Sequence, residues 1–251
     1  MKKFSSEFGH SYNTYTFGYA NYCLREKGDS LADIYASGYL PYSGGPDIKN
    51  IFYMARSARM PLDLFSLSSE NRRIVKKFDD QFERTVTPIY KFDRHDHKFL
   101  KFCVEYFAKR HGPDVMPLAR LKTILDSDLI IQIVSYHNAI DPVAYVFEVA
   151  DHAMVHFWFS FYDLSLVHQS LGMWLMLDSA RQAQKRGAKH FYVGTVYGQK
   201  ALYKTAFKNL EYWNGQDWTA NLKKIKQLGR DDASRTVGLT DLWKKEQKKF
   251  D

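Results

Sequence analysis

The sequence of 251 residues holds only two cysteines, Cys23 and Cys103, which lie far apart and in no metal-ligand spacing. This scarcity excludes a disulfide framework and is typical of a reducing compartment. No apolar run reaches transmembrane length, and the first residues, MKKFSSEFGHS, lack the apolar segment of a signal peptide. We therefore expect a cytoplasmic protein without membrane insertion and without a metal site.

Basic and aromatic residues are plentiful. Lys and Arg number 36 against 28 Asp and Glu, which gives a net charge of +8, and aromatic residues make up 16% of the chain. Such an aromatic content is typical of a folded core and not of a disordered chain. The positive charge favours a polyanionic partner such as nucleic acid, although a merely soluble basic protein has the same balance.

The pattern of apolar residues in the second half of the chain predicts a strand-helix-strand unit. The expected order is a buried strand, a long helix, a second strand and a short helix, over residues 155–162, 170–185, 190–194 and 199–207. Gly187, just after basic residues, is a typical helix C-terminal signal. Strands joined in this way usually lie parallel, and ligands gather where the first strand meets the helix. We therefore expect a functional site near residues 162–172.

The elements upstream extend this unit to a recognisable order. Two helices and two hairpin-linked strands are predicted over residues 95–111, 118–126, 129–137 and 143–150. With the unit that follows, this is the running order of the acetyltransferase-like α/β fold called GNAT. The expected fold is a GNAT-like mixed sheet flanked by helices, with a smaller α+β N-terminal domain. The division we predict is an N-terminal domain, a transferase domain and a charged tail, over residues 1–85, 86–228 and 229–251.

One predicted helix in the N-terminal half is strongly basic. Ser68 is a suitable N-cap for it, and Glu70 suits its first turn. Its cations form two adjacent stripes at helical spacing: Arg72, Arg73, Lys76 and Lys77. Such a run is either a solvated helix face or a surface for sequence-independent phosphate contacts.

Several motifs resemble, in the same order, those of the arginyl- and leucyl-tRNA–protein transferases of the N-end rule. In the second half these are Phe161-Tyr162-Asp163, Ser170-Leu171-Gly172, Tyr192-Val193-Gly194 and Lys200 followed by Tyr203-Lys204. Residues 35–44 and 56–77 are similar to the family's N-terminal segments. The resemblance implies an enzyme that moves an amino acid from aminoacyl-tRNA to the N-terminal amine of a protein or peptide, with no further cofactor.

The chain departs from that family in its N-terminal part. The family carries cysteines there, including a CxxC, whereas this chain reads YMARSARM at residues 53–60. A metal or iron–sulfur site at this place is therefore not expected. Asp163 is also not followed by proline, so the chain resembles a divergent member whose amino acid or acceptor differs.

Two alternatives remain open from the sequence. The segment ALYKTAF at residues 201–207 is also similar to the "LYEKLGF" of acetyl-CoA-dependent GNAT enzymes, in which the tyrosine is a general acid. Those enzymes hold the CoA pyrophosphate on a Gly-rich loop, and residues 167–172 offer a single glycine, which favours an aminoacyl-tRNA donor. The other alternative is a catalytically inactive tRNA-binding module.

Three side chains are candidates for chemistry in an aminoacyl transfer, which needs a free amine, an oriented ester and a stabilised oxyanion. Asp163 is placed to contact a substrate amine, or else to cap the following turn. Tyr203 is a candidate donor to the leaving 3′-oxygen, or else a packing residue. His168 is a candidate base, or else an ordinary surface histidine.

The candidate binding residues are those with backbone N–H groups, polar tips or positive charge around the same loop. Donor phosphate or ribose is expected at Gln169, Ser170, Leu171 and Gly172. The tRNA acceptor end is expected at Lys200 and Lys204, one turn apart, unless these are exposed helix lysines.

Overall fold

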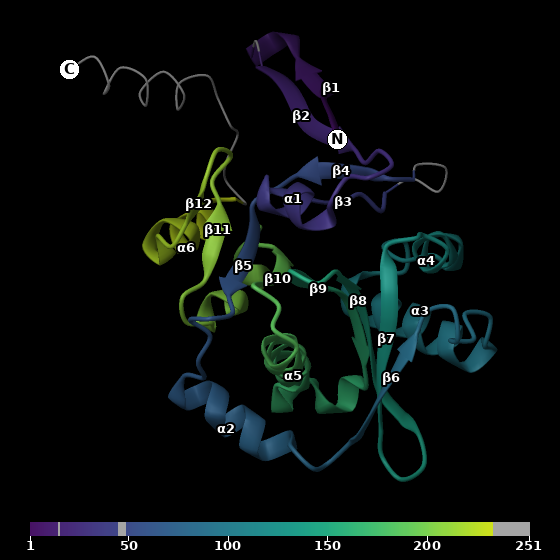
Figure 1. The fold of residues 1–251 in the computed structure, drawn as a ribbon. Helices are drawn as coiled ribbons and strands as arrows, with labels where there is room; N and C mark the ends of the chain where they lie inside the picture. Colours follow the sequence, from purple (N-terminus) through teal and green to yellow (C-terminus); the bar gives the residue numbers. More distant parts are fainter. Residues whose placement is uncertain (15, 45–48, 233–251) are drawn as a thin grey trace.

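The computed structural model describes residues 1–14, 16–44 and 49–232. The described chain forms two sheets, one of four strands and one of eight, with helices around the larger one (Figure 1). This confirms the predicted α/β fold with a large mixed sheet flanked by helices. Within the described residues, no helix is both long enough and apolar enough to cross a membrane.

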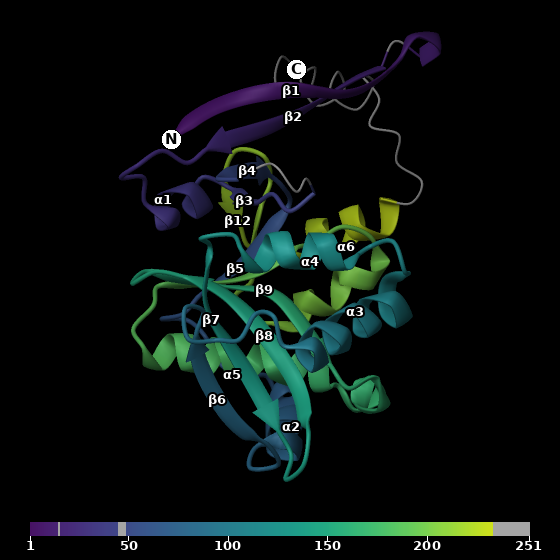
Figure 2. The ribbon, with the colours of Figure 1, turned by 90° about the vertical axis from the view of Figure 1, so that its right-hand side faces the viewer.

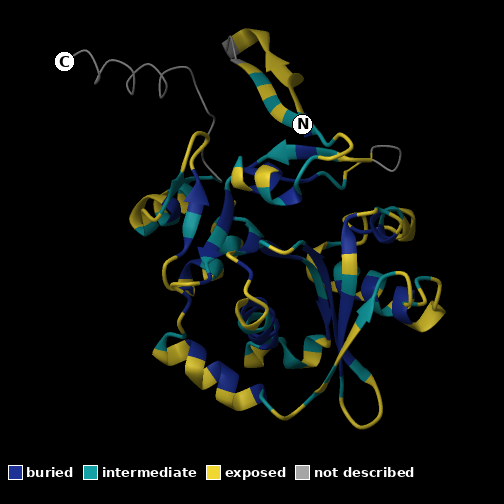
Figure 3. Cartoon of the chain, in the orientation of Figure 1, coloured by how far each residue is buried: buried dark blue, intermediate teal, exposed yellow. Residues whose placement is uncertain are grey.

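The smaller sheet is made by the N-terminal residues. Its strands lie in the order β1 (Lys2–Ser11), β2 (Thr16–Leu24), β4 (Ile51–Met54) and β3 (Tyr39–Pro41), all antiparallel. Helix α1 (Leu31–Ala36) packs beside β3. Its cap, Ser30, accepts a hydrogen bond from the Asp33 N–H. The β1–β2 ribbon, which carries η1 (Tyr12–Thr14) at its tip, projects from the body (Figure 1). Residues of β1 are exposed, whereas β2 also carries the buried Cys23 (Figure 3).

The larger sheet carries the rest of the chain. Its strand order is β12 (Trp218–Thr219), β11 (Glu211–Trp213), β5 (Ser57–Pro61), β10 (His190–Thr195), β9 (Met154–Tyr162), β8 (Pro142–Ala150), β7 (Ile130–His137) and β6 (Glu83–Pro88). The pair β9–β10 is parallel, as the strand-helix-strand pattern predicts, and the other neighbours are antiparallel.

Helices cover both faces of this sheet (Figure 2). On one face lie α2 (Ser69–Phe78) and α5 (Leu171–Lys185), and Trp174 of α5 contacts the Tyr136 ring of β7. On the other lie α3 (His97–His111) and α4 (Leu118–Leu125), with Phe99 against Tyr145 of β8. The helix α6 (Leu222–Asp231) packs on the 3₁₀ helix η3 (Gln199–Ala206).

Helix α5 is anchored to the sheet by a buried carboxylate. Asp178 is 4% exposed and accepts hydrogen bonds from the Tyr136 hydroxyl at 2.7 Å and from Nε of Arg84 at 2.9 Å. The Arg181 guanidinium lies 3.3 Å away and also binds Asp79, at the end of α2, at 2.8 Å. Burial and the charge of Asp178 raise the pKa of Tyr136, so its hydroxyl stays a donor. The network joins β6, β7, α2 and α5.

Strand β6 was not predicted from the sequence. Its residues, ERTVTP, pair with β7 from Glu83 opposite His137 to Pro88 opposite Gln132, and most of them are not buried. A polar edge strand that ends in proline lacks the apolar pattern by which strands are recognised. The predicted division between residues 85 and 86 therefore falls inside a strand.

The domain limits remain predictions, with one change that the topology supports. Strand β5 and helix α2 precede residue 85, yet β5 lies inside the larger sheet and both contribute side chains to its core. We therefore propose that the N-terminal unit ends near Met54, before β5 begins. The limit at 228 falls within α6, and residues 233–251 of the predicted tail lie outside the described residues.

Candidate active site

A cavity of about 1020 Å³ opens where β9 and β10 separate. Their parallel pairing covers residues 154–156 and 190–192, while β9 continues to Tyr162. Strand β10 has a register shift between Tyr192 and Gly194, where Gly194 takes a φ of 80° that favours glycine. The separated segments, residues 157–160 with Tyr162 and residues 193–195, line the cavity.

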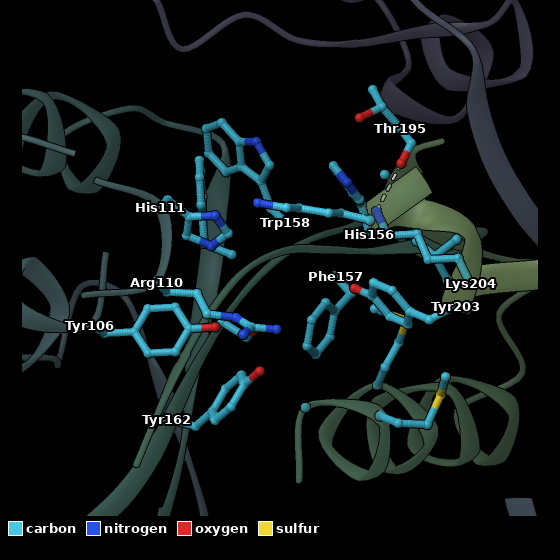
Figure 4. Close-up of a pocket in the computed structure, with 18 of the residues that line it drawn as sticks. Tyr106, Arg110, His111, His156, Phe157, Trp158, Tyr162, Thr195, Tyr203 and Lys204 are labelled. Carbon is cyan, nitrogen blue, oxygen red and sulfur yellow. Dashed lines mark hydrogen bonds between the residues drawn. The ribbon is translucent and has the colours of Figure 1, made fainter. Parts of the chain in front are cut away.

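Several further elements complete the walls. The C-terminal turns of α3 contribute Tyr106, Arg110 and His111, and η3 contributes Lys200, Tyr203 and Lys204. The start of η2–α5 contributes Ser170, Gly172, Met173 and Met176, where η2 spans Leu164–Gln169. Arg120 of α4 and residues of the smaller sheet close one end. Figure 4 shows Arg110 pointing into this space near the rings of Tyr106 and Tyr162.

The cavity is positively charged. Among the described residues that line it, the only carboxylate is Glu70, and it pairs with Arg73 at 2.7 Å. No ion pair is found for Arg110 within the described part of the chain. Burial, then the charges of Arg110 and Lys200, lower the pKa of His111. The site therefore favours an anionic ligand.

At the inner end of the cavity a histidine and a lysine lie side by side. His156 is 2% exposed, and its Nδ1 lies 2.9 Å from the Tyr35 hydroxyl of α1. Lys204 Nζ donates to the Thr195 carbonyl at 2.9 Å. Burial, then the Lys204 charge, lowers the pKa of His156 to about 3, and burial lowers the pKa of Lys204 to about 8. His156 is therefore neutral at physiological pH.

Neutral burial of His156 makes folding sensitive to acid. Its folded pKa of about 3 lies below the usual 6.5, so between these values the unfolded chain binds a proton that the folded chain does not. Stability should fall as the pH drops below 6.5, by at most about 1.4 kcal/mol per pH unit. Denaturant unfolding at pH 7 and pH 5 measures this. The fall in stability between pH 7 and pH 5 should be smaller in His156→Gln, and it should be unchanged in His152→Gln, where the replaced residue is exposed. Equal acid sensitivity of His156→Gln and the parent would contradict it.

The structure brings together five of the candidate residues named from the sequence. Ser170 and Gly172, at the start of α5, face Lys200, Tyr203 and Lys204 of η3 across the cavity. Tyr203 lines the cavity and is half exposed. The partial burial of its hydroxyl raises the pKa of Tyr203 to about 12. It therefore stays protonated and able to donate.

Other candidates lie outside the cavity. Asp163 accepts a hydrogen bond from the Ser165 N–H at 2.8 Å and caps η2, as its capping alternative predicts, and it does not line the cavity. Its contact with a substrate amine stays a prediction. His168 and Gln169 are exposed and do not line the cavity, and Leu171 is fully buried in the core. A side chain at a turn is directed by its own capping bonds, which the sequence order alone does not specify.

The basic stripe of α2 also lies outside the cavity. Its four cations are exposed: Arg72, Arg73, Lys76 and Lys77. Arg73 pairs with Glu70 and Arg72 donates to the Leu67 carbonyl at 2.9 Å. The same helix borders the cavity through Glu70 and Ile74, so the stripe lies next to the opening.

The residues that α3 and β9 bring into the site were not predicted from the sequence. Arg110 and His111 belong to a basic last turn, which is also an ordinary helix C-terminal pattern. His156 lies in an apolar strand, where an isolated histidine has no periodic signal. Its position within an aromatic run was the one available hint.

Comparison with known proteins agrees with this architecture. The family model described as an acetyltransferase (GNAT) domain matches residues 69–208. The chain belongs to this GNAT family. The match begins at α2 and ends after η3, so it includes most of the cavity lining and the β9–α5–β10 unit, but not the lining residues of the smaller sheet.

Two curated proteins with the same name are similar in sequence to this GNAT chain. An aspartate/glutamate leucyltransferase of Dinoroseobacter shibae is 25% identical over 176 residues, covering 64% of this chain and 61% of the relative. One of Sinorhizobium medicae is 39% identical over 62 residues, covering 24% of each chain. The chain therefore spans at most about three fifths of these relatives' lengths.

Solved structures are similar at low identity. FemX is 10% identical with a TM-score of 0.43, covering 66% of this chain and 59% of FemX. A conserved protein of unknown function from Bacteroides thetaiotaomicron is 14% identical with a TM-score of 0.42, covering 61% and 54%. At these TM-scores the likeness carries no functional argument.

Proposed function

We propose that the chain transfers an amino acid from aminoacyl-tRNA to the amine of a protein or peptide N-terminus. The GNAT family supports an acyltransferase, and the relatives named leucyltransferase support an aminoacyl donor. The observation that carries the proposal is the cavity itself, which is large, cationic and without a free carboxylate among the described residues. Its volume, about 1020 Å³, is at the upper end of small-molecule sites and leaves room for a terminal nucleoside with its amino acid.

The donor's phosphate would bind between α3 and the start of α5. Arg110 supplies a guanidinium with no ion pair among the described residues, and Lys200 lies on the facing wall. The first turn of α5 lines the same space, and its Ser170 side chain makes no capping bond to the helix. Free N–H groups and the helix dipole favour an anion at such an end.

An apolar section of the cavity suits the side chain of the transferred amino acid. Phe157, Met173 and Met176 line it together with Ile74 of α2. Unbranched methionines adapt to the shape of an aliphatic group. We assign this section to an apolar residue such as leucine. By analogy with the relatives' names, the acceptor would begin with aspartate or glutamate.

An acetyl-CoA-dependent reaction is the second candidate, because the matching family model is described as an acetyltransferase and Tyr203 lines the cavity. The loop of residues 167–172, where such enzymes hold the CoA pyrophosphate, argues against an acetyl-CoA-dependent reaction. A Cβ at Gly172 would lie 2.7 Å from the Tyr162 hydroxyl, so the close approach that this glycine allows is already used by Tyr162. We therefore place the aminoacyl donor first.

A transfer assay tests the proposal. Purified protein is incubated with tRNAs charged with labelled amino acids and with peptides beginning with Asp, Glu, Lys or Arg. Label in a peptide identifies the amino acid and the acceptor together. Retention of tRNA without any labelled peptide would instead indicate a binding module without catalysis.

The basic stripe of α2 should bind the body of the tRNA. Lys76→Glu with Lys77→Glu should weaken tRNA binding and lower the slope of log K against log salt by about 1 for each phosphate that the protein no longer neutralises. The matched control reverses Lys223 and Lys224, which are also neighbouring lysines but lie on α6. Equal weakening by the two double variants would show that net charge, and not this helix face, sets the affinity.

A further inference from the structure

Lys204 has an environment unlike that of the other cavity cations. Its Nζ is held by the Thr195 carbonyl at 2.9 Å and has no carboxylate partner in the described residues. A Cβ at Gly194 would lie 3.5 Å from this Nζ and 3.7 Å from Nε2 of His156, so both groups converge on one side of the strand. Figure 4 shows the same convergence beside Tyr203.

The groups that face Lys204 do not stabilise its charged form. From β9 comes the neutral imidazole of His156, with the buried Tyr35 of α1 behind it. Its own helix also brings Tyr203 and the cation Lys200 to the cavity lining. The exception is the Thr195 carbonyl, which accepts a hydrogen bond from Nζ and so favours the charged amine. An amine so placed loses its proton more readily than an exposed lysine, in agreement with its pKa of about 8.

We propose that Lys204 is the general base of the transfer, and that it removes the proton from the attacking acceptor amine. This rests on the proposed function. The amine nitrogen attacks the ester carbonyl, a C–N bond forms, and the Lys204 amine takes a proton from that nitrogen. The C–O3′ bond then breaks, and the leaving oxygen takes a proton from the Tyr203 hydroxyl. Exchange of one proton with solvent at each residue restores the site, and the products are an amide and a free 3′-hydroxyl.

The two titratable side chains that lie beside Lys204, His156 and Tyr203, are less suited to this task. His156 is too weak a base, since its pKa is about 3, and its Nδ1 is already bonded to Tyr35. Tyr203, with a pKa of about 12, stays protonated and is an acid at neutral pH. A base with a pKa near the working pH is the most effective, and a positioned one contributes about 10²- to 10⁴-fold.

The test compares Lys204→Arg with Lys208→Arg, because Lys208 is exposed and does not line the cavity. Arginine keeps the positive charge but cannot act as a base, so Lys204→Arg should lower kcat about 10²- to 10⁴-fold with little change in KM for charged tRNA. Lys208→Arg should keep kcat within a few-fold. Thermal unfolding of both variants confirms that they fold. Lys204→Ala should regain part of its rate with trimethylamine, which accepts a proton but cannot be acylated to an amide.

Two results would overturn the base assignment and leave the transfer itself standing. One is a folded Lys204→Arg variant with near-parental kcat, which would show that only the charge is needed. The other is an NMR titration of the Lys204 side chain in the parent with its pKa near 10, since such an amine is protonated at neutral pH. Failure of the parent protein to transfer any amino acid would refute the proposed function instead, and the NMR titration would still report on the amine.

Discussion

Replacing Asp178 with alanine is expected to lower the free energy of unfolding by about 3–5 kcal/mol. The substitution leaves the half-buried Arg84 without its carboxylate and the buried Tyr136 hydroxyl without its acceptor. Removing one member of a buried charged network costs more than the net contribution of the pair, because the remaining charge stays buried. Denaturant unfolding at neutral pH measures the difference.

A conservative variant and a surface control make this result specific. Asp178→Asn keeps an acceptor for Tyr136 but removes the charge, so it should be less destabilised than the alanine variant. Glu105→Gln breaks an exposed pair with Lys101, 3.7 Å apart, and should change stability by less than about 0.5 kcal/mol. An Asp178→Ala protein as stable as the Glu105→Gln control would contradict the role of Asp178 as the anchor of α5.

Replacing Arg110 with alanine is expected to raise the KM for charged tRNA about 10- to 100-fold. A hydrogen bond to a charged group contributes about 1.5–3 kcal/mol, which corresponds to that range. Arg110 lines the cavity and has no ion pair among the described residues, so its charge is free for the ligand. Initial rates of transfer at varied tRNA concentration provide the measurement.

The neighbouring Lys109 supplies the control for Arg110. It lies on the same last turn of α3 and is also exposed, but it does not line the cavity. Lys109→Ala removes the same formal charge and should change KM by less than about threefold, as expected of an exposed charge. If both variants lose affinity equally, Arg110 acts through the general field of the helix end and not by contact with the donor.

Local chemistry explains which parts of the fold were predictable. Ser68 begins α2 by accepting from the Asn71 N–H, and Gly187 ends the α5 region at a φ of 78°. These signals depend only on nearby residues, so they can be recognised in the sequence. The position of β5 between β10 and β11 depends on pairing with residues more than about 100 positions away, and no local pattern specifies that.

The residues of the candidate site fall into the same two groups: those marked by a local sequence motif and those brought in by long-range packing. Ser170 and Lys204 were predicted as site residues because they belong to motifs between β9 and the end of η3, and both line the cavity. Arg110 and His156 reach it through the crossing of α3 over β9 and through the separation of β9 from β10. Asp163 was a candidate for a substrate contact or for a turn cap because it ends a strand, and its Oδ1 accepts a hydrogen bond from the Ser165 N–H of the following turn.

One measurement tests the central claim most directly. A peptide beginning with aspartate is incubated with the protein, leucyl-tRNA and acetyl-CoA together, and the product is analysed by mass spectrometry. The account predicts a peptide that has gained one leucine at its N-terminus, and no acetylated product. An acetylated peptide without added leucine would contradict the aminoacyl-tRNA assignment and identify an acetyl-CoA-dependent member of the GNAT family.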